Sequence, residues 1–212
     1  MSIPRQVGKT FFVGSVMIAL CLLFAKLQVV WTAHHGRTST KTFQSMQSMV
    51  RRKKIAPHVL SIRTANGEQE IRFRNGSVIS FGARSQGFGR GFDEIDAEVF
   101  DEAQILTEKA LSDMIPAANQ SRHKHGALVW YMGTPPRPSD PGEAFSNKRK
   151  KALSGKSKDM VYVECAADSD AKLDDVKQWA RANPSYPLRT PHESMERMRE
   201  NLDIFNFSLT DN

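Results

Sequence analysis

The sequence contains little cysteine, and its cysteines and histidines do not have the spacing of a zinc site. Cys21 and Cys165 are the two cysteines, each within an apolar run and without a CxxC pair or a Cys/His spacing. Isolated cysteines of this kind are typical of reduced, buried thiols in a cytosolic protein. The histidines within residues 34–35 and 123–125 have no carboxylate or cysteine at ligand spacing. The sequence therefore predicts neither a disulfide bond nor a metal site built on these histidines.

The sequence also lacks an apolar run of membrane-spanning length. The longest run, residues 11–24, covers about 14 residues before Lys26, whereas a spanning helix needs about 20. Basic residues precede this run, so an alternative interpretation is a secretory signal peptide. No small-residue cleavage site follows, because the chain leads directly into the β-rich residues 29–31. We therefore expect a helix buried on nearly all sides, with no membrane partner.

A second complete catalytic domain does not fit into 212 residues, which are enough for one domain with a substantial core. The hydrophobic content of 40% and the charged content of 25% are ordinary for a globular protein. Lysine and arginine outnumber the acids by seven, which favours a polyanionic partner such as nucleic acid.

Strands and helices alternate along most of the chain. Strands are predicted at residues 28–33, 60–64, 70–74, 77–81, 97–100, 127–132 and 161–165, and helices at 11–24, 38–52, 107–115, 173–181 and 192–201. Thr38 or Ser39 is the expected cap of the second helix. Turns at Asn66-Gly67 and Asn75-Gly76 indicate hairpins, so a β-meander is inserted in the α/β frame. The pattern predicts an open, mostly parallel sheet whose ligand site lies at the carboxyl ends of its strands.

The chain begins with a segment that resembles a phosphate-binding loop. Gly8-Lys9-Thr10 opens the first helix, where backbone N–H groups and the helix dipole favour phosphate oxygens. Lys9 is expected to reach the β and γ phosphates and Thr10 to hold magnesium. The standard motif has a glycine five residues before Gly8, and Ile3 stands there instead. A capped helix start with an exposed lysine is the alternative.

An acidic pair follows the buried strand at residues 97–100. Asp101 is expected to bind magnesium and Glu102 to polarise the water that attacks the γ-phosphate. The pair is the arrangement of a Walker B motif, although Glu98 is a polar interruption of its strand. The alternative is a solvated acidic turn.

In this order, the motifs resemble those of phage large terminases, the motors that package double-stranded DNA. The resemblance rests on the Pro-Arg-Gln-x-Gly-Lys-Thr loop, the Asp-Glu-Ala-Gln segment at residues 101–104, the Gly-Thr-Pro turn at residues 133–135 and Ala182-Asn183-Pro184. It implies a P-loop NTPase fold of the ASCE type that hydrolyses ATP with Mg²⁺. It also implies roles for particular residues. The nucleotide would be bound by Pro4, Arg5, Gln6, Val7, Gly8, Lys9 and Thr10, and the metal by Thr10 and Asp101. Lys9 and Glu102 would act in catalysis, and the coupling turn would consist of Gly133, Thr134 and Pro135.

The resemblance further implies two parts of the chain and a set of partners. Residues 1–170 are expected to form the ATPase domain, with a curtailed strand before the phosphate loop. Residues 171–212 are expected to lead toward a nuclease domain that this chain lacks, so we expect no nuclease activity. The implied partners are double-stranded DNA, a portal protein, the small terminase subunit and further copies of the chain on the portal, in the host bacterial cytoplasm.

Two basic features remain open at this stage. Arg90 lies in a glycine-rich loop upstream of the acidic pair, and an arginine near the γ-phosphate can stabilise transition-state charge. Lys148, Arg149, Lys150 and Lys151 form the densest basic cluster, which is either a surface for DNA phosphates or a solvated loop. Two other functions are kept beside the packaging motor: a helicase-like ATPase, and an inactive prophage remnant of a terminase.

Overall fold

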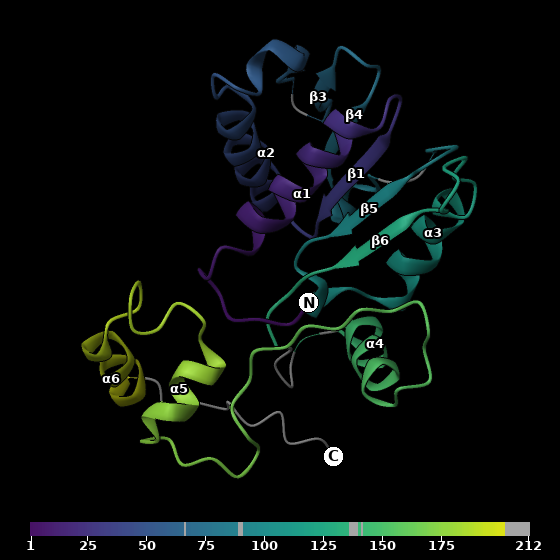
Figure 1. The fold of residues 1–212 in the computed structure, drawn as a ribbon. Coiled ribbons are helices and arrows are strands. Elements are labelled where there is room, and N and C mark those ends of the chain that lie inside the picture. The colour runs from purple at the N-terminus through teal and green to yellow at the C-terminus, as the bar shows by residue number, and fades with distance from the viewer. Residues whose placement is uncertain (66, 89–90, 136–139, 141, 202–212) are drawn as a thin grey trace.

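A six-stranded sheet forms the centre of the computed structural model, which describes residues 1–201 other than 66, 89–90, 136–139 and 141 (Figure 1). The strands are β1 (Gln28–Ala33), β2 (Val59–Arg63), β3 (Gln69–Phe73), β4 (Val78–Ala83), β5 (Ala97–Phe100) and β6 (Leu128–Tyr131). The α-helices are α1 (Lys9–Leu23), α2 (Gly36–Val50), α3 (Glu108–Ala118), α4 (Glu143–Leu153), α5 (Val176–Ala182) and α6 (His192–Asn201). Short 3₁₀ turns are η1 (Ala56–His58), η2 (Arg84–Gln86) and η3 (Ala103–Ile105).

The sheet has the strand order β2-β3-β4-β1-β5-β6. The pairings of β4 with β1, β1 with β5 and β5 with β6 are parallel, whereas β2, β3 and β4 pair antiparallel. The three antiparallel strands follow one another in the chain with short turns between them. These pairings confirm the predicted parallel sheet and its inserted β-meander.

The chain segment that enters the phosphate loop lies beyond β6. Ser2 forms parallel bridges with Gly133 on one side and Glu164 on the other. Its N–H donates to the Val163 carbonyl (2.8 Å), and its own carbonyl accepts from the Cys165 N–H (3.0 Å). The strand predicted at residues 161–165 is reduced to a single bridge, because its partner segment pairs over only a few residues.

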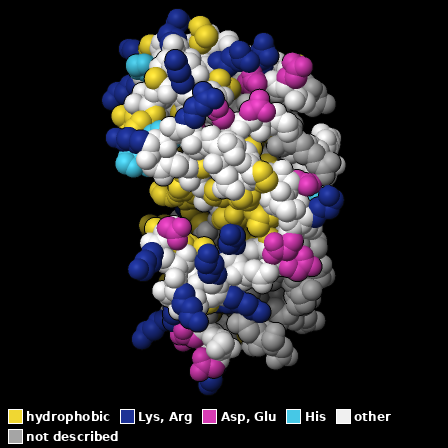
Figure 2. Space-filling view, turned by 90° about the vertical axis from the view of Figure 1, so that its right-hand side faces the viewer, with side chains coloured by type: hydrophobic (Ala, Val, Ile, Leu, Met, Phe, Trp, Pro, Cys, Tyr) yellow, Lys and Arg dark blue, Asp and Glu magenta, His cyan; other side chains and the backbone are white. Residues whose placement is uncertain are grey.

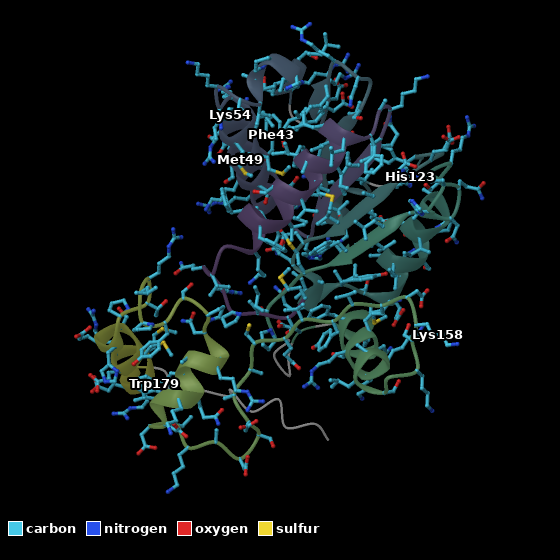
Figure 3. The ribbon with its side chains drawn as sticks, viewed as in Figure 1. Phe43, Met49, Lys54, His123, Lys158 and Trp179 are labelled. Carbon is cyan, nitrogen blue, oxygen red and sulfur yellow. The ribbon has the colours of Figure 1, made fainter. Side chains whose placement is uncertain are left out.

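The two faces of the sheet carry two apolar clusters. Helices α1 and α2 cover one face, where Trp31, Phe81 and Val99 are buried, and α3 lies on the other, where Phe100 and Leu106 are buried (Figure 1). In Figure 3, Phe43 and Met49 of α2 are labelled together with Lys54, which follows this helix. Both apolar side chains are buried, whereas Lys54 is exposed. The sheet is thus covered on both faces, as parallel sheets require.

Helix α1 is apolar but not buried on all sides. Val13, Met17 and Cys21 are inaccessible to solvent, whereas Phe11 and Phe12 are more than half exposed. The expectation of a helix buried nearly all round is therefore wrong for its first turn. Among the described residues, no helix combines the length and the apolar character that crossing a membrane requires.

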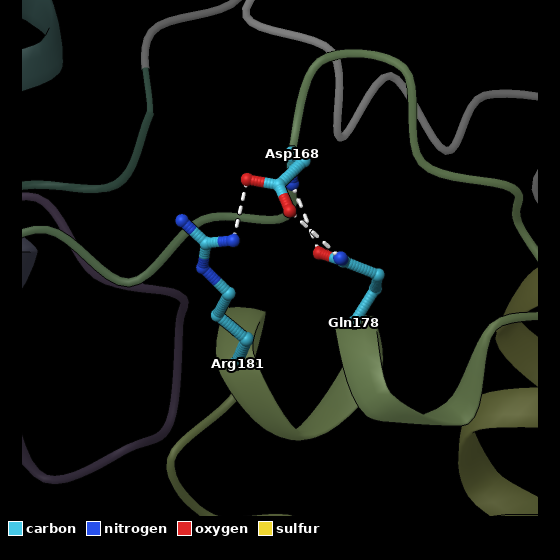
Figure 4. Close-up of polar contacts among 3 residues, drawn as sticks. All are labelled: Asp168, Gln178 and Arg181. Carbon is cyan, nitrogen blue, oxygen red and sulfur yellow. Dashed lines mark hydrogen bonds and ion pairs between the residues drawn. The ribbon is translucent and has the colours of Figure 1, made fainter.

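The C-terminal part has a small core of its own. Trp179 of α5 contacts the rings of Tyr186 and His192, and its indole N–H donates to the Leu173 carbonyl (2.7 Å). Asp168 is held to α5 by Gln178 and by Arg181 (Figure 4). Helices α5 and α6 therefore pack around aromatic side chains rather than against the sheet.

Seen from the side that carries α3, the surface is hollowed across its middle (Figure 2). Hydrophobic side chains gather in this hollow, and lysine and arginine side chains lie above and below it. Leu128 of β6 belongs to the exposed large hydrophobic residues of the chain.

Candidate nucleotide-binding site

The candidate site lies at the edge of the sheet where the parallel strands end. Strands β1, β5 and β6 are parallel, so the residues that follow them, His34, Asp101 and Met132, meet at one edge. The segment at Ser2 runs parallel to β6 and leads into the loop before α1. Ligands of open α/β sheets bind at this edge.

The loop before α1 has the backbone shape that a phosphate cradle requires. Gly8 precedes the first residue of α1 with φ 90°, and Gln6 also has a positive φ of 62°. No side chain caps the N-terminus of α1, and its first turn contains no acid. The first N–H groups of this helix are thus oriented for an anion. Pro4, Val7 and Thr10 are half-buried in or beside the loop, whereas Arg5 and Gln6 are exposed.

Lys9 folds back over its own loop. Its ammonium group donates to the carbonyls of Ile3 (2.8 Å) and Pro4 (2.5 Å). Burial lowers the pKa of Lys9 to about 8, an effect that the nearby Asp101 carboxylate opposes and the Arg5 guanidinium reinforces. Lys9 and Asp101 therefore lie near enough for the carboxylate to affect the pKa of the ammonium group.

Asp101 is buried directly after β5. Burial raises the pKa of its carboxyl group, and the hydrogen bond that it accepts from the Glu102 N–H (2.8 Å) partly opposes this rise. The Thr42 hydroxyl lies 3.5 Å from its other oxygen. The Trp31 side chain and the Arg84 charge also oppose the rise. A carboxylate buried to this extent is stabilised by a cation.

This donor set fits magnesium. Mg²⁺ in nucleotide sites is held by one or two protein oxygens together with phosphate oxygens and water. Thr10, in the first turn of α1, and the buried Asp101 supply oxygens of this kind. The described residues contain no group of three or more His, Cys, Asp or Glu side chains placed to hold an ion alone.

Glu102 points in a different direction from Asp101. Its backbone is left-handed (φ 54°), and its carboxylate accepts hydrogen bonds from the His34 N–H and the Thr38 hydroxyl, both at 3.0 Å. Thr38 or Ser39 was expected to cap α2, but this helix begins at Gly36 and His35 is its N-cap. The expectation was wrong because the Thr38 hydroxyl bonds a distant carboxylate instead of a nearby N–H.

Arg84 is a structural part of the site that the sequence does not reveal. Its guanidinium donates to the carbonyls of Thr32 (2.9 Å) and Asp101 (2.8 Å), and thereby ties the end of β1 to the acidic pair. Burial lowers the pKa of Arg84 to about 10, and the Glu102 carboxylate opposes this shift. Its partners are backbone carbonyls, which leave no pattern in the sequence.

Gln104 joins the acidic segment to the Gly-Thr-Pro turn. Its side-chain oxygen accepts from the Thr134 N–H (3.3 Å), and the Ala103 N–H donates to the Met132 carbonyl (3.0 Å). A Cβ atom on Gly133 would lie 2.7 Å from this same oxygen, so only glycine allows the close approach. Pro135 is half-buried beside the turn.

The remaining predicted residues are not assembled at this site. Arg90 lies outside the described residues. Lys148 and Arg149 belong to α4, a helix that the sequence did not predict, and Lys148 lies over the Tyr131 ring at 5.2 Å. Arg149 pairs with Glu164 through two hydrogen bonds (2.9 and 3.3 Å). Of this basic cluster, Lys150 and Lys151 are exposed, whereas Lys148 and Arg149 are half-buried.

Taken with the strand order, these loops define a P-loop NTPase fold. The segment at Ser2 lies between Gly133, which follows β6, and Glu164. Strand β5, which leads into the acidic pair, lies on the other side of β6. No protein-family model matches the chain, and no curated protein matches it in sequence.

Comparison with solved structures narrows the fold to that of large terminase ATPase domains. The bacteriophage HK97 large terminase superposes with a TM-score of 0.80 over 95% of this chain, at 18% sequence identity. The large terminase of a thermophilic bacteriophage gives a TM-score of 0.52 over 71% of this chain at 15% identity. The ATPase domain of the Thermus phage P74-26 large terminase gives 0.52 over 68% at 16% identity.

These comparisons confirm the predicted fold. The chain spans 42% of the HK97 protein, 38% of the thermophilic bacteriophage protein and 61% of the P74-26 domain.

Proposed function

We propose that this chain is the ATPase domain of a phage large terminase and drives double-stranded DNA into a capsid by hydrolysing ATP. One observation carries the proposal: Lys9, folded over the loop before α1, lies near enough to the buried Asp101 for the carboxylate to affect its pKa, in a sheet whose fold matches large terminases. The ordered motifs at residues 4–10, 101–104 and 133–135 give it independent support.

The loop residues 4–10 would bind the phosphates of ATP. The N–H groups at the start of α1 would donate to phosphate oxygens, and Lys9 would exchange its two loop carbonyls for the β and γ phosphates. Thr10 and Asp101 would hold Mg²⁺, which neutralises charge on the phosphates when bound.

Glu102 would activate the attacking water. The water oxygen forms a bond to the γ-phosphorus while the bond between that phosphorus and the β–γ bridging oxygen of ATP breaks, and Glu102 takes the proton of the water. Arg90 remains a prediction for charge stabilisation. Through Gln104, a change at the acidic pair would reach Thr134 and its turn, which we propose as the coupling element.

The DNA surface that we favour is the solvent face of α2. No acid precedes Glu68, whereas ten lysines and arginines do, so residues 1–67 carry +10 and the rest of the chain −3 of the net +7. Exposed residues recur at helical spacing along this α2 face: Arg37, Lys41, Gln44, Ser45, Ser48, Arg51 and Arg52. A face roughly 22 Å long, given the helical rise per residue, can follow several phosphates of a duplex.

Lys150 and Lys151 are the alternative DNA contacts, since Lys148 and Arg149 are engaged with Tyr131 and Glu164. The further partners that we propose are the portal protein, the small terminase subunit and copies of this chain. They would act in the cytoplasm of a bacterial host.

Displacement of a third strand from triplex DNA tests the proposed function. A translocase on an intact duplex releases the third strand in an ATP-dependent manner, and Glu102→Gln should abolish the release. Release of a strand from a forked duplex, without triplex displacement, would instead identify a helicase. A wild-type chain that fails to bind Mg-ATP would favour the inactive remnant.

A further inference from the structure

The first turn of α1 exposes two aromatic side chains beside the candidate phosphate loop. Phe11 is 55% exposed and Phe12 is 54% exposed, although the next residues of the helix, Val13 and Gly14, are buried. Adjacent exposed aromatic rings beside a candidate ligand site are apolar surface that a bound molecule can cover. The role of each ring depends on what already contacts it.

The two rings have different surroundings. The Phe12 ring meets the Trp130 ring of β6 edge-on, with the ring centroids 6.2 Å apart. The Phe11 ring lies under the guanidinium of Arg52, which follows α2, and the guanidinium carbon is 5.7 Å from the ring centroid. A planar cation thus lies over the Phe11 ring, while more than half of this side chain remains open to solvent. Phe11 therefore has room for a second planar group.

Phe11 directly follows the residues that we propose to bind phosphate. The backbone hydrogen bonds of α1 begin with the N–H of Phe12, which donates to the Gly8 carbonyl (2.9 Å). The N–H groups of Lys9, Thr10 and Phe11 precede it, at the helix end that favours anions. In such loops the backbone N–H groups hold the α and β phosphates, while the lysine reaches the β and γ phosphates. The α-phosphate, which carries the nucleoside, is therefore bound by a turn that includes Phe11.

We propose that the Phe11 ring, with Arg52 over it, is the surface on which the base of the bound nucleotide stacks. This proposal rests on the proposed function above. Stacking does not read the hydrogen-bonding edge of a base, because every base has a π-face. The substrate class is therefore purine nucleoside triphosphates, ATP and GTP alike, and the smaller pyrimidine bases are held more weakly.

Calorimetric affinities for ATP and for inorganic tripolyphosphate, both with Mg²⁺, test the proposal, because the two ligands share the phosphates and only ATP carries a base. Phe11→Ala should lower the affinity for ATP about tenfold, which lies within the range for losing one base stack, and leave that for tripolyphosphate unchanged. Phe11→Trp keeps an aromatic ring and should restore the wild-type affinity for ATP. The wild type should bind GTP and ATP with affinities within about threefold of each other, and CTP more weakly.

Phe12→Ala is the matched control, because it removes an equally exposed ring from the same turn and should change neither affinity. Equal losses for ATP and tripolyphosphate in Phe11→Ala, or no loss for either, would overturn the stacking surface. A preference for ATP over GTP of more than about tenfold would overturn it too, because it requires hydrogen bonds to the base. The proposed function would survive these results if the wild type binds both ligands and Lys9→Ala binds neither. A wild type that binds neither ligand would overturn both proposals.

Discussion

At the scale of single residues, the burial of Lys9 should make the proposed nucleotide binding depend on pH. Burial lowers the pKa of Lys9 to about 8, and bound phosphates favour its protonated form. Binding above this pH must therefore take up a proton. We predict that affinity for Mg-ATP falls by about tenfold per pH unit above pH 8. Calorimetric titrations at several pH values, in buffers of different ionisation enthalpy, measure both the affinity and the proton uptake.

Lys9→Arg is the control for this prediction, since a guanidinium stays charged throughout the range. Its affinity, even if lower, should not change with pH. Wild-type binding that is independent of pH between 7 and 10 would show that Lys9 does not contact the phosphates.

Glu98 provides a second prediction at this scale, about stability. Its carboxylate is fully buried, both oxygens are without a partner among the described residues, and burial raises its pKa to about 7. A carboxyl with a raised pKa contributes stability below its ordinary pKa near 4.5 and loses that contribution as the pH rises through 7. Glu98→Gln should therefore be more stable than the wild type at pH 8, by about 1–3 kcal/mol, and equal to it near pH 4.5.

Urea denaturation of both proteins at pH 5 and pH 8 measures this difference. Glu68→Gln is the control, because Glu68 is exposed and should give no pH-dependent difference. A Glu98→Gln variant that is less stable at pH 8 would mean that the carboxylate has a partner in solution.

At the scale of elements, the sequence predicted the sheet because its strands are short apolar runs between clear turns. Helix α4 was not predicted, because its sequence lacks such an apolar pattern. Its residues Glu143–Leu153 contain few apolar side chains, so no helical period is visible, although Glu143 in its first turn and Lys151 in its last suit the helix dipole. The strand at residues 161–165 was overestimated, because pairing depends on the length of the partner segment rather than on apolar content.

The residues of the candidate site also fall into two groups, those that the sequence predicts and those that it does not. Lys9 and Asp101 were predictable, because a lysine at a helix start and an acid at a strand end are local patterns. Arg84 and Thr38 were not, since their partners lie far along the chain and are backbone carbonyls or a carboxylate. Interactions of this kind depend on the register of β1, β4 and β5, which the sequence alone does not specify.

The α2 face leads to a prediction about DNA. Replacing Arg37, Lys41 and Arg51 by alanine should weaken binding to all duplex sequences equally. The slope of log affinity against log salt should become shallower by about one per lost phosphate contact. Fluorescence anisotropy at several salt concentrations measures both quantities.

Two further variants make this experiment specific. The control variant replaces three exposed residues of the C-terminal part by alanine: Lys172, Lys177 and Arg189. It loses the same three positive charges as the α2 variant and should leave the salt slope unchanged. If instead Lys150→Ala with Lys151→Ala lowers the slope and the α2 variant does not, DNA binds beside α4.

At the scale of the whole molecule, the positive charge and the acidic residues of the candidate site come from different parts of the chain. The acid-free residues 1–67 include both the phosphate loop and α2, so nucleotide and DNA would be held by the same basic part. The acids that we propose to act on the nucleotide come later, after β5, and lie between this basic part and the Gly-Thr-Pro turn. We therefore expect the proposed ATP hydrolysis and DNA contact to be connected through β1, β5 and α2.

Single-turnover conversion of ATP to ADP, with protein in excess over labelled ATP and with or without Mg²⁺, tests the central claim most directly. We predict that the wild type converts ATP only with Mg²⁺ and that Lys9→Ala neither binds nor converts it. Glu102→Gln should bind ATP with unchanged affinity and convert it at least about 100-fold more slowly, as expected for loss of a general base. Conversion at the wild-type rate by both variants, or a wild type that does not bind Mg-ATP, would contradict the account.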